Sequence, residues 1–181
     1  MQELLNWTID TIREDISTDL SWLEEKKFDW TPLVANTLKK VIQKNYSVLV
    51  ITDDRQQWFA NYVLGKLNSK YRPYLPFYDF NKFCSSIKDI KSQEDIDLVI
   101  DMLNISFPSG FLFWYIGGTE HKNFALQRFY EGSFLWLVDK DQQGAISFHE
   151  DDKYLDIKLV QLYSLLDKTI DAAMFGNIEL D

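Results

Sequence analysis

Cysteine and histidine are scarce in this chain of 181 residues, which contains one cysteine and two histidines. The single cysteine, Cys84, excludes an internal disulfide and any zinc or redox centre built on a Cys-x-x-Cys pair. His121 and His149 are far apart and neither belongs to a His-Glu-x-x-His motif, so we expect no metal site and interpret both as surface residues. Cys84 is interpreted as a buried structural residue; a nucleophile paired with His121 is the alternative.

Glycine-rich loops, basic residues and long apolar runs are also lacking. The chain has 7 glycines and contains neither G-x-G-x-x-G nor G-x-x-x-x-G-K-[S/T], so no nucleotide or phosphate cofactor is expected. Acidic residues outnumber basic ones by 28 to 19, and the net charge of −9 repels nucleic-acid phosphates. The apolar runs are too short to cross a membrane, and the first residues do not resemble a signal peptide. We expect a cytoplasmic protein without a cofactor or direct nucleic-acid contact.

The sequence does contain enough apolar residues for one folded domain. Hydrophobic residues make up 46% of the chain and charged residues 26%, both near the average for globular proteins. A chain of this length buries roughly 70% of its unfolded surface around a single core. Aromatic residues reach 15%, more than such a core needs, so some of them are expected at an interface. We expect a single domain over residues 1–181.

Helical and strand-like segments alternate along most of the chain. The predicted strands span residues 47–51, 74–78, 110–116, 133–138 and 144–148. The predicted helices span residues 1–23, 31–45, 55–67, 124–130 and 154–175, with two more helical patterns between 80 and 107. Thr31 and Pro32 are interpreted as the N-cap and first residue of the second helix, and Pro76 places its strand at a sheet edge or bulge. Strands that alternate with helices predict a three-layer α/β/α sandwich with a mainly parallel sheet.

The first and last predicted helices have informative apolar patterns. The stripe of the first helix consists of Leu5, Ile9, Ile12, Ile16, Leu20 and Leu23. Trp7 projects from the opposite side and is expected to face solvent unless something covers it. The last helix has a second apolar strip, formed by Val160, Tyr163 and Met174, beside its main one. Such a helix contacts two neighbours, one being the sheet and the other a second subunit or the first helix.

No catalytic constellation emerges from the polar residues. Asp53 and Asp54, after the first strand, are either an acid/base pair or an N-cap beside a solvated neighbour, and the cap is favoured. Gly117-Gly118 is interpreted as an ordinary strand-end turn, and Glu150-Asp151-Asp152 as the acidic first turn of the last helix. The aromatic residues out of step with the core stripes either cover helix edges or form a protein-binding surface; they are Trp7, Trp22, Phe28, Trp30 and Phe175.

Five segments together resemble the HobA family, in the same order and over essentially the whole chain. They are Trp58–Tyr62, Asp79–Asn81, Phe113–Gly117, Ser133–Leu137 and Leu155–Leu162. The resemblance implies a flavodoxin- or Rossmann-like fold similar to DiaA and sugar isomerase (SIS) domains, with a parallel five-stranded sheet. It also implies a non-enzymatic homotetramer, a dimer of dimers, that binds the N-terminal domain of the initiator DnaA and promotes its assembly at the chromosomal origin.

The same resemblance implies a partner surface formed by the first helix and the C-terminal end of the last one. By position, its residues here are Gln2, Leu4, Trp7, Met174, Phe175 and Ile178. The SIS likeness also leaves an alternative function, a phosphosugar-binding sensor or isomerase. Asp53 and Asp54 stand where SIS enzymes have Ser/Thr- and Gly-rich turns, so loss of phosphosugar chemistry is expected.

Overall fold

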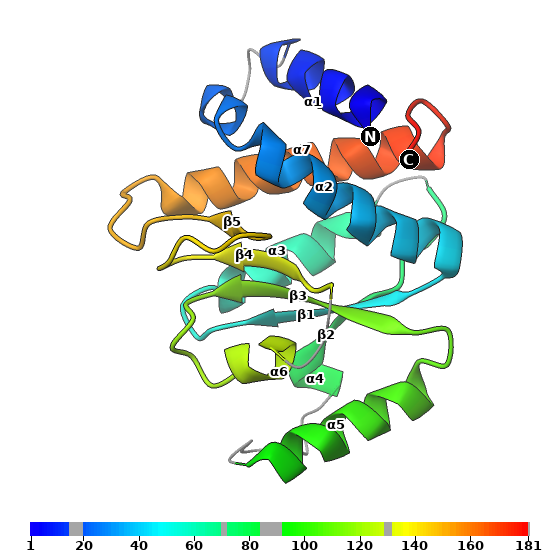
Figure 1. Ribbon diagram of the computed structural model, residues 1–181, viewed down its shortest axis with the longest axis vertical. Helices are drawn as coiled ribbons and strands as arrows, with labels where there is room; N and C mark the ends of the chain where they lie inside the picture. The colour runs from blue at the N-terminus through cyan, green and yellow to red at the C-terminus, as the bar shows by residue number, and fades with distance from the viewer. Residues whose placement is uncertain (15–19, 70–71, 84–91, 129–131, 181) are drawn as a thin grey trace.

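The chain forms one parallel sheet in a computed structural model that describes residues 1–14, 20–69, 72–83, 92–128 and 132–180 (Figure 1). The strands are β1 (Ser47–Thr52), β2 (Phe77–Asp79), β3 (Phe111–Gly117), β4 (Phe134–Leu137) and β5 (Ile146–Ser147). Their order is β2-β1-β3-β4-β5, and every neighbouring pair is parallel. This order is that of the flavodoxin-like doubly wound folds, so the predicted α/β class and parallel sheet are confirmed. β2 is an edge strand, as Pro76 predicted.

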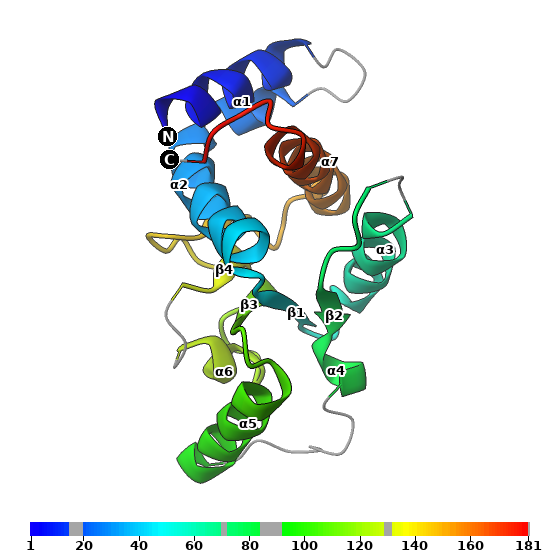
Figure 2. The same cartoon turned by 90° about the vertical axis from the view of Figure 1, so that its right-hand side faces the viewer.

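Helices cover both faces of the sheet, and one helix forms a further layer (Figures 1 and 2). One face carries α2 (Lys27–Leu38), η2 (Lys39–Gln43), α3 (Gln57–Leu67) and α7 (Leu155–Met174). The other face carries α4 (Phe80–Phe83), α5 (Gln93–Ser106) and α6 (Phe124–Arg128). The remaining helices are α1 (Gln2–Glu14) and the short 3-10 helix η1 (Ser21–Glu24). α1 contacts α2 and α7, so it lies outside the layer that contacts the sheet.

Alternate residues of the central strands belong to two different cores. Leu112, Trp114 and Ile116 of β3 join the core beneath α2, α3 and α7, while Phe111 and Phe113 join the core on the α5 and α6 side. All residues of β3 are buried. A strand covered on both faces needs apolar residues at every position, which explains the continuous apolar run that identified this strand in the sequence.

The first helical segment differs from its prediction in length and orientation. The described part of α1 runs to Glu14, and Leu23 lies in η1, so the helix predicted as far as residue 23 is too long. The buried residues of α1 are Leu4, Thr8 and Ile12, whereas Leu5 and Ile9 are only half-buried and Ile16 lies outside the described residues. The buried face is therefore rotated by roughly 60° from the predicted stripe. Contacts with α2 and α7 select this face.

The second helix begins four residues earlier than predicted. α2 starts at Lys27, and Thr31 lies inside it, where its hydroxyl donates to the Lys27 carbonyl at 2.8 Å. Thr31 is therefore not an N-cap. The indole of Trp30 is buried in the core, with its ring centroid 6.1 Å from that of Phe134. Burial of Trp30 holds the segment before Pro32 against the sheet, and this contact extends the helix towards its N-terminus.

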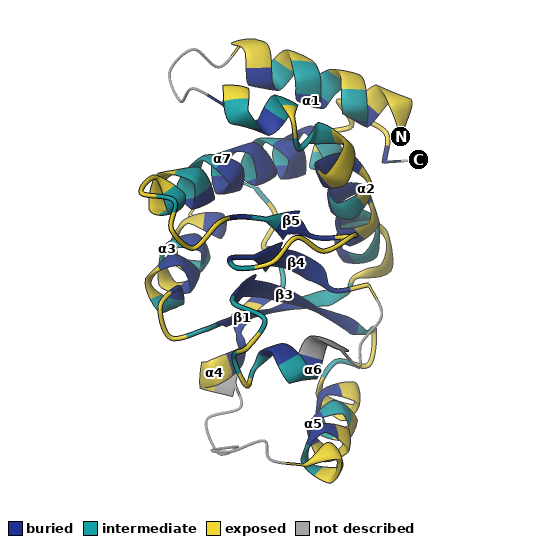
Figure 3. Ribbon diagram, turned by 60° about the vertical axis from the view of Figure 1, so that its left-hand side comes forward, coloured by how far each residue is buried: buried dark blue, intermediate teal, exposed yellow. Residues whose placement is uncertain are grey.

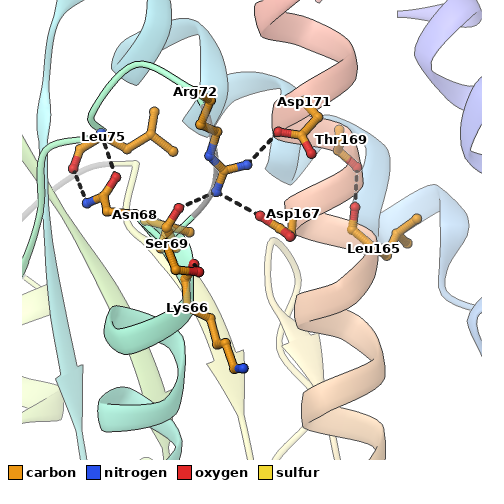
Figure 4. A network of polar contacts seen from close by, with 10 residues as sticks. Lys66, Asn68, Ser69, Arg72, Leu75, Leu165, Asp167, Thr169 and Asp171 are labelled. Carbon is orange, nitrogen blue, oxygen red and sulfur yellow. Dashed lines mark hydrogen bonds and ion pairs between the residues drawn. The ribbon is translucent and has the colours of Figure 1, made fainter.

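A buried arginine ties the loop before β2 to the last helix (Figure 4). The Arg72 side chain is 1% exposed and its guanidinium lies 2.7 Å from Asp167 Oδ1 and 2.7 Å from Asp171 Oδ1. It also donates to the Leu67 carbonyl, at the end of α3, at 2.6 Å. The planar guanidinium can satisfy several acceptors in fixed directions, which an ammonium group cannot. Arg72 thus connects α3, the β2 loop and α7.

Replacing Arg72 with methionine should destabilise the protein by about 3 kcal/mol, because Asp167 and Asp171 would lose their shared cation in a partly buried site. The urea unfolding midpoint measures this loss. Arg13→Met is the control, since Arg13 forms an ion pair with Glu24 at 2.8 Å that is largely exposed. Exposed pairs contribute little. Equal midpoint shifts for the two variants would contradict the role assigned to Arg72.

Candidate partner-binding surface

The two ends of the chain lie side by side at one end of the molecule (Figures 1 and 2). The N-terminal end of α1 is next to the end of the tail that follows α7, and α1 contacts α7. We call the group formed by Gln2, Trp7, Met174 and Phe175 the terminal surface. These residues come from helices at opposite ends of the sequence that contact each other in the fold.

A Schellman motif ends α7 and fixes the position of Phe175. The Asn177 amide donates to the Ala172 carbonyl at 2.8 Å, and the Gly176 amide donates to the Ala173 carbonyl at 3.4 Å. Gly176 has φ +74°, a conformation that favours glycine. The tail then folds back, and Ile178 joins the main core. Phe175 remains 62% exposed at the end of a well-ordered helix.

The side chains assigned to the surface differ in how much area they offer to a partner. Gln2 and Phe175 are exposed, and the Gln2 amide donates to Asn6 Oδ1 at 3.1 Å. Trp7 and Met174 are half-buried and pack against the main core. Trp7 is therefore not fully exposed to solvent, because its side chain packs against the main core.

Two of the predicted contact residues are buried. Leu4 is 0% exposed and Ile178 is 5% exposed, and both belong to the main core. They hold α1 and the tail in place and offer no area to a partner. Met1, which is not among the predicted contact residues, is 51% exposed beside Gln2.

The other aromatic residues singled out in the sequence are distributed between core and surface. Trp22 is half-buried; its indole N–H donates to Gln161 Oε1 at 2.8 Å and its ring lies 5.9 Å from that of Phe148. Trp30 is buried. Phe28 is 68% exposed on α2, where it lines a hollow of about 510 Å³ away from the terminal surface. Trp22 and Trp30 therefore have structural roles.

A second hollow, of about 730 Å³, lies at the carboxyl ends of the strands. This is where doubly wound folds usually bind ligands, next to the point at which the strand order reverses. Six carboxylates line it, namely Asp53, Asp54, Glu120, Asp139, Glu150 and Asp156. Arg55 also lines it and forms an ion pair with Glu150 across the opening. Such a charge balance disfavours an anionic ligand.

The innermost carboxylate of this hollow already accepts two backbone hydrogen bonds. Asp53 Oδ1 accepts from the Gln56 amide and Asp53 Oδ2 from the Gly118 amide, both at 2.9 Å. Asp53 thus closes the turn before α3 and occupies an amide that a phosphate would need. The N-cap of α3 is Gln56, with no side-chain cap hydrogen bond, so the predicted N-cap role of Asp53 or Asp54 is wrong. Asp54 is fully exposed, so the two do not form an acid/base pair.

Two further contacts close the turn after β3. Asp139 Oδ2 accepts from the Thr119 amide at 2.6 Å, and the Tyr115 hydroxyl donates to the Gly118 carbonyl at 2.6 Å. Burial, and to a lesser extent Asp53 and Asp139, raise the pKa of Tyr115 well above its usual range, so the phenol stays a donor. Gly117 has φ +150°, and a Cβ there would lie 2.6 Å from Asp53 Oδ2. The Gly117-Gly118 turn therefore fits closely against Asp53.

The histidines and the acidic cluster before α7 have local roles. His121 is half-buried, with Nδ1 accepting from the Asn123 amide at 3.3 Å, and His149 is exposed. The Glu150–Asp152 cluster precedes α7 instead of forming its first turn. Asp152 accepts from the Lys158 ammonium at 2.6 Å and from the Tyr154 amide at 2.9 Å, and these bonds lower its pKa.

The described residues contain neither a metal cluster nor a membrane helix. No three His, Cys, Asp or Glu side chains in this part of the chain are grouped so that they could hold a metal ion. No helix formed by these residues has the length and apolarity that a membrane crossing requires. Cys84 lies outside the described residues, so its predicted burial stays a prediction.

Comparisons with family models, with known sequences and with solved structures all match the same family. The family model for HobA, a DNA replication regulator, matches residues 1–180. The DNA replication regulator protein HobA of Helicobacter pylori is 28% identical, over 99% of this chain and 100% of that protein. Two crystal structures from H. pylori each have a TM-score of 0.77 and cover 99% of both chains. One is HobA, at 27% identity, and the other is a HobA complex with DnaA domains I–II, at 28% identity.

These matches confirm the resemblance seen in the five sequence segments, which already covered essentially the whole chain. The fold and the family match therefore point to one conclusion: this chain belongs to the HobA family of DNA replication regulators.

Proposed function

We propose that this chain is a non-catalytic adaptor that binds domains I–II of DnaA through its terminal surface. The solved complex of a HobA relative with DnaA domains I–II, which this chain matches over 99% of its length, supports the choice of partner. The observation that carries the choice of surface is Phe175. Its ring is 62% exposed although it sits at a helix end fixed by backbone hydrogen bonds.

The terminal surface suits a protein partner because its apolar groups are already ordered. Phe175 provides an aromatic anchor, a residue type that commonly dominates interface energetics. Met174, half-buried beside it, has an unbranched side chain that adapts to the shape of a partner. Gln2 supplies amide donor and acceptor groups at the rim. Little conformational entropy is lost on binding, since α1 and α7 are fixed before the partner arrives.

We also propose that the chain is cytoplasmic and assembles as a homotetramer, a dimer of dimers. A tetramer presents several terminal surfaces, so each bound DnaA raises the effective concentration of the next one. Modest single-site affinity then suffices for an ordered array. The net charge of −9 keeps the scaffold itself from competing for the DNA, because like charges repel.

Light scattering coupled to size exclusion should find a tetramer whose mass rises in steps of one DnaA fragment when the isolated domains I–II are added. The steps give the stoichiometry directly. A tetramer whose mass stays constant at saturating fragment would contradict DnaA binding, and a monomer that binds one fragment would contradict the scaffold.

Phe175→Ala should weaken DnaA domain I–II binding by about thirtyfold, equivalent to about 2 kcal/mol, because a central aromatic contact is truncated. Tyr154→Ala is the matched control, since Tyr154 is 59% exposed at the opposite end of α7. Isothermal titration measures both affinities. Both variants should unfold at the temperature of the unsubstituted protein. Comparable losses of affinity, or none in either variant, would show that Phe175 does not anchor the partner.

The alternative function, a phosphosugar sensor or isomerase, is disfavoured by the carboxylates around the second hollow. A ligand at one hundred times its dissociation constant would add about 2.7 kcal/mol of stability. We expect glucose 6-phosphate and fructose 6-phosphate to leave the thermal unfolding midpoint unchanged. A midpoint that rises with sugar-phosphate concentration, and that Asp53→Asn alters, would support the ligand-binding function instead.

A further inference from the structure

The outer side of α5 has an unusual surface. α5 lies at the far end of the long axis from α1 and the terminal surface (Figures 1 and 2). Its inner residues Ile96, Val99 and Leu103 are buried in the second core. On its outer side, Leu98 is 71% exposed and Ile105 is 83% exposed. These are the two most exposed large apolar side chains in the described part of the chain.

Four exposed residues of α5 form a straight strip that alternates between acidic and apolar side chains, and Asp97 is exposed beside it. Its members are Glu94, Leu98, Asp101 and Ile105, and we call this group the outer strip. The spacing of four, three and four residues puts all of them on one side of the helix. Leu98 and Ile105 lie about 10 Å apart along the axis. Figure 3 shows the exposed outer side of α5.

The stability of the helix does not explain its acidic residues. Ser92 and Asp95 form a capping box at the N-terminus, and Glu94 lies in the first turn, where a negative charge is favourable. Asp97 accepts a hydrogen bond from the Gln93 side-chain amide at 2.9 Å, but Asp101 has no such local role, and Asp97 and Asp101 are four residues apart, an arrangement of like charges that disfavours a helix. α5 has no basic residue, and in the described part of the chain no basic side chain forms an ion pair with Asp97 or Asp101.

The charge of the strip determines the kind of partner that fits it. Two copies of α5 packed face to face would bring the carboxylates of Glu94, Asp97 and Asp101 in one chain close to those of the other, with no basic residue on α5 to balance them, so self-association through this face is disfavoured. An anionic membrane is repelled for the same reason. A partner with apolar residues flanked by lysine or arginine would cover the exposed side chains and neutralise the carboxylates.

We propose that the outer strip of α5 binds a basic amphipathic helix of a second partner protein. A helix presents residues i and i+7 about 10 Å apart on one side, which matches the separation of Leu98 and Ile105. Residues on one face of an extended strand are about 7 Å apart and do not match it. The strip is separate from the terminal surface, so the scaffold would hold this partner at the end opposite to DnaA.

The probe is a fluorescein-labelled peptide of 18 residues with leucine at alternating spacings of three and four and lysine elsewhere. Anisotropy should show that it binds the full chain, whereas the same peptide with glutamate in place of lysine should not bind. Leu98→Ser with Ile105→Ser, and separately Asp97→Lys with Asp101→Lys, should each weaken binding by about tenfold or more. The matched charge control is Glu25→Lys with Asp141→Lys, at two exposed positions outside α5, which should change the affinity by about twofold at most.

Each other outcome overturns the inference. Equal weakening by the charge control would mean non-specific attraction to an acidic protein, and unchanged binding by the Leu98→Ser, Ile105→Ser variant would mean that the strip is not the site. A lower native mass of that variant in light scattering would identify a second copy as the occupant. Loss of DnaA domain I–II binding in that variant would assign the strip to DnaA, a result distinct from the Phe175→Ala test.

Discussion

Burial of the two central strands on both faces is the constraint on which the rest of this structure depends. β1 and β3 are apolar at nearly every position, so each face of the sheet must be covered before the strands can leave water. The chain meets this requirement with α2, α3 and α7 on one side and with α4, α5 and α6 on the other. Parallel strands also place all their carboxyl ends at one edge. The two cores and the shape of that edge both follow from this single requirement.

The edge that usually binds ligands in such folds is used here for internal contacts. Asp53 accepts the amides of Gln56 and Gly118, and Asp139 accepts the Thr119 amide. These bonds hold the strand-end turns together and leave carboxylates around an open hollow. A parallel α/β scaffold can therefore lose its anion site without losing its fold, because the turns are stabilised by the chain's own side chains. The surfaces that we propose for function are instead a helix end and an outer helix face.

Those surfaces lie at the two ends of the long axis (Figures 1 and 3). At one end, α1 and the end of α7 bring the two chain termini together, and the tail returns to the core through Ile178. At the other end, α5 uses one face for the second core and leaves its outer face in water. Helices with exposed apolar side chains suit the adaptor role that we propose, since they bind without first having to fold. Arg72 contributes by fixing α7, which carries Phe175, to α3.

The sequence by itself determined the elements whose burial is complete. Continuous apolar runs identified β1, β3 and β4 because both faces of a central strand have the same requirement, and Pro76 identified an edge because it lacks an amide donor. Two adjacent carboxylates and the lack of a glycine loop predicted that the turn after β1 does not bind phosphate, since that chemistry is local. The order of five segments was enough for the resemblance to the HobA family.

Only the tertiary structure decided which face of α1 is buried, where α2 begins and which of the candidate contact residues reach solvent. Leu4 and Leu5 are adjacent in α1, so its apolar residues cover a wide part of the helix surface. The helix can therefore rotate about its axis and still bury apolar residues, and its sequence alone does not fix which face is buried. Contacts with α2 and α7 made the choice, and they buried Leu4 while leaving Trp7 half-covered. The exposure of Phe175 and the burial of Ile178 depend on how the turn after α7 directs the tail back onto the core. The local sequence pattern does not show this contact, because it involves residues far away in the chain. The sequence thus determines which segments must bury apolar residues, and tertiary packing decides which neighbouring element buries them.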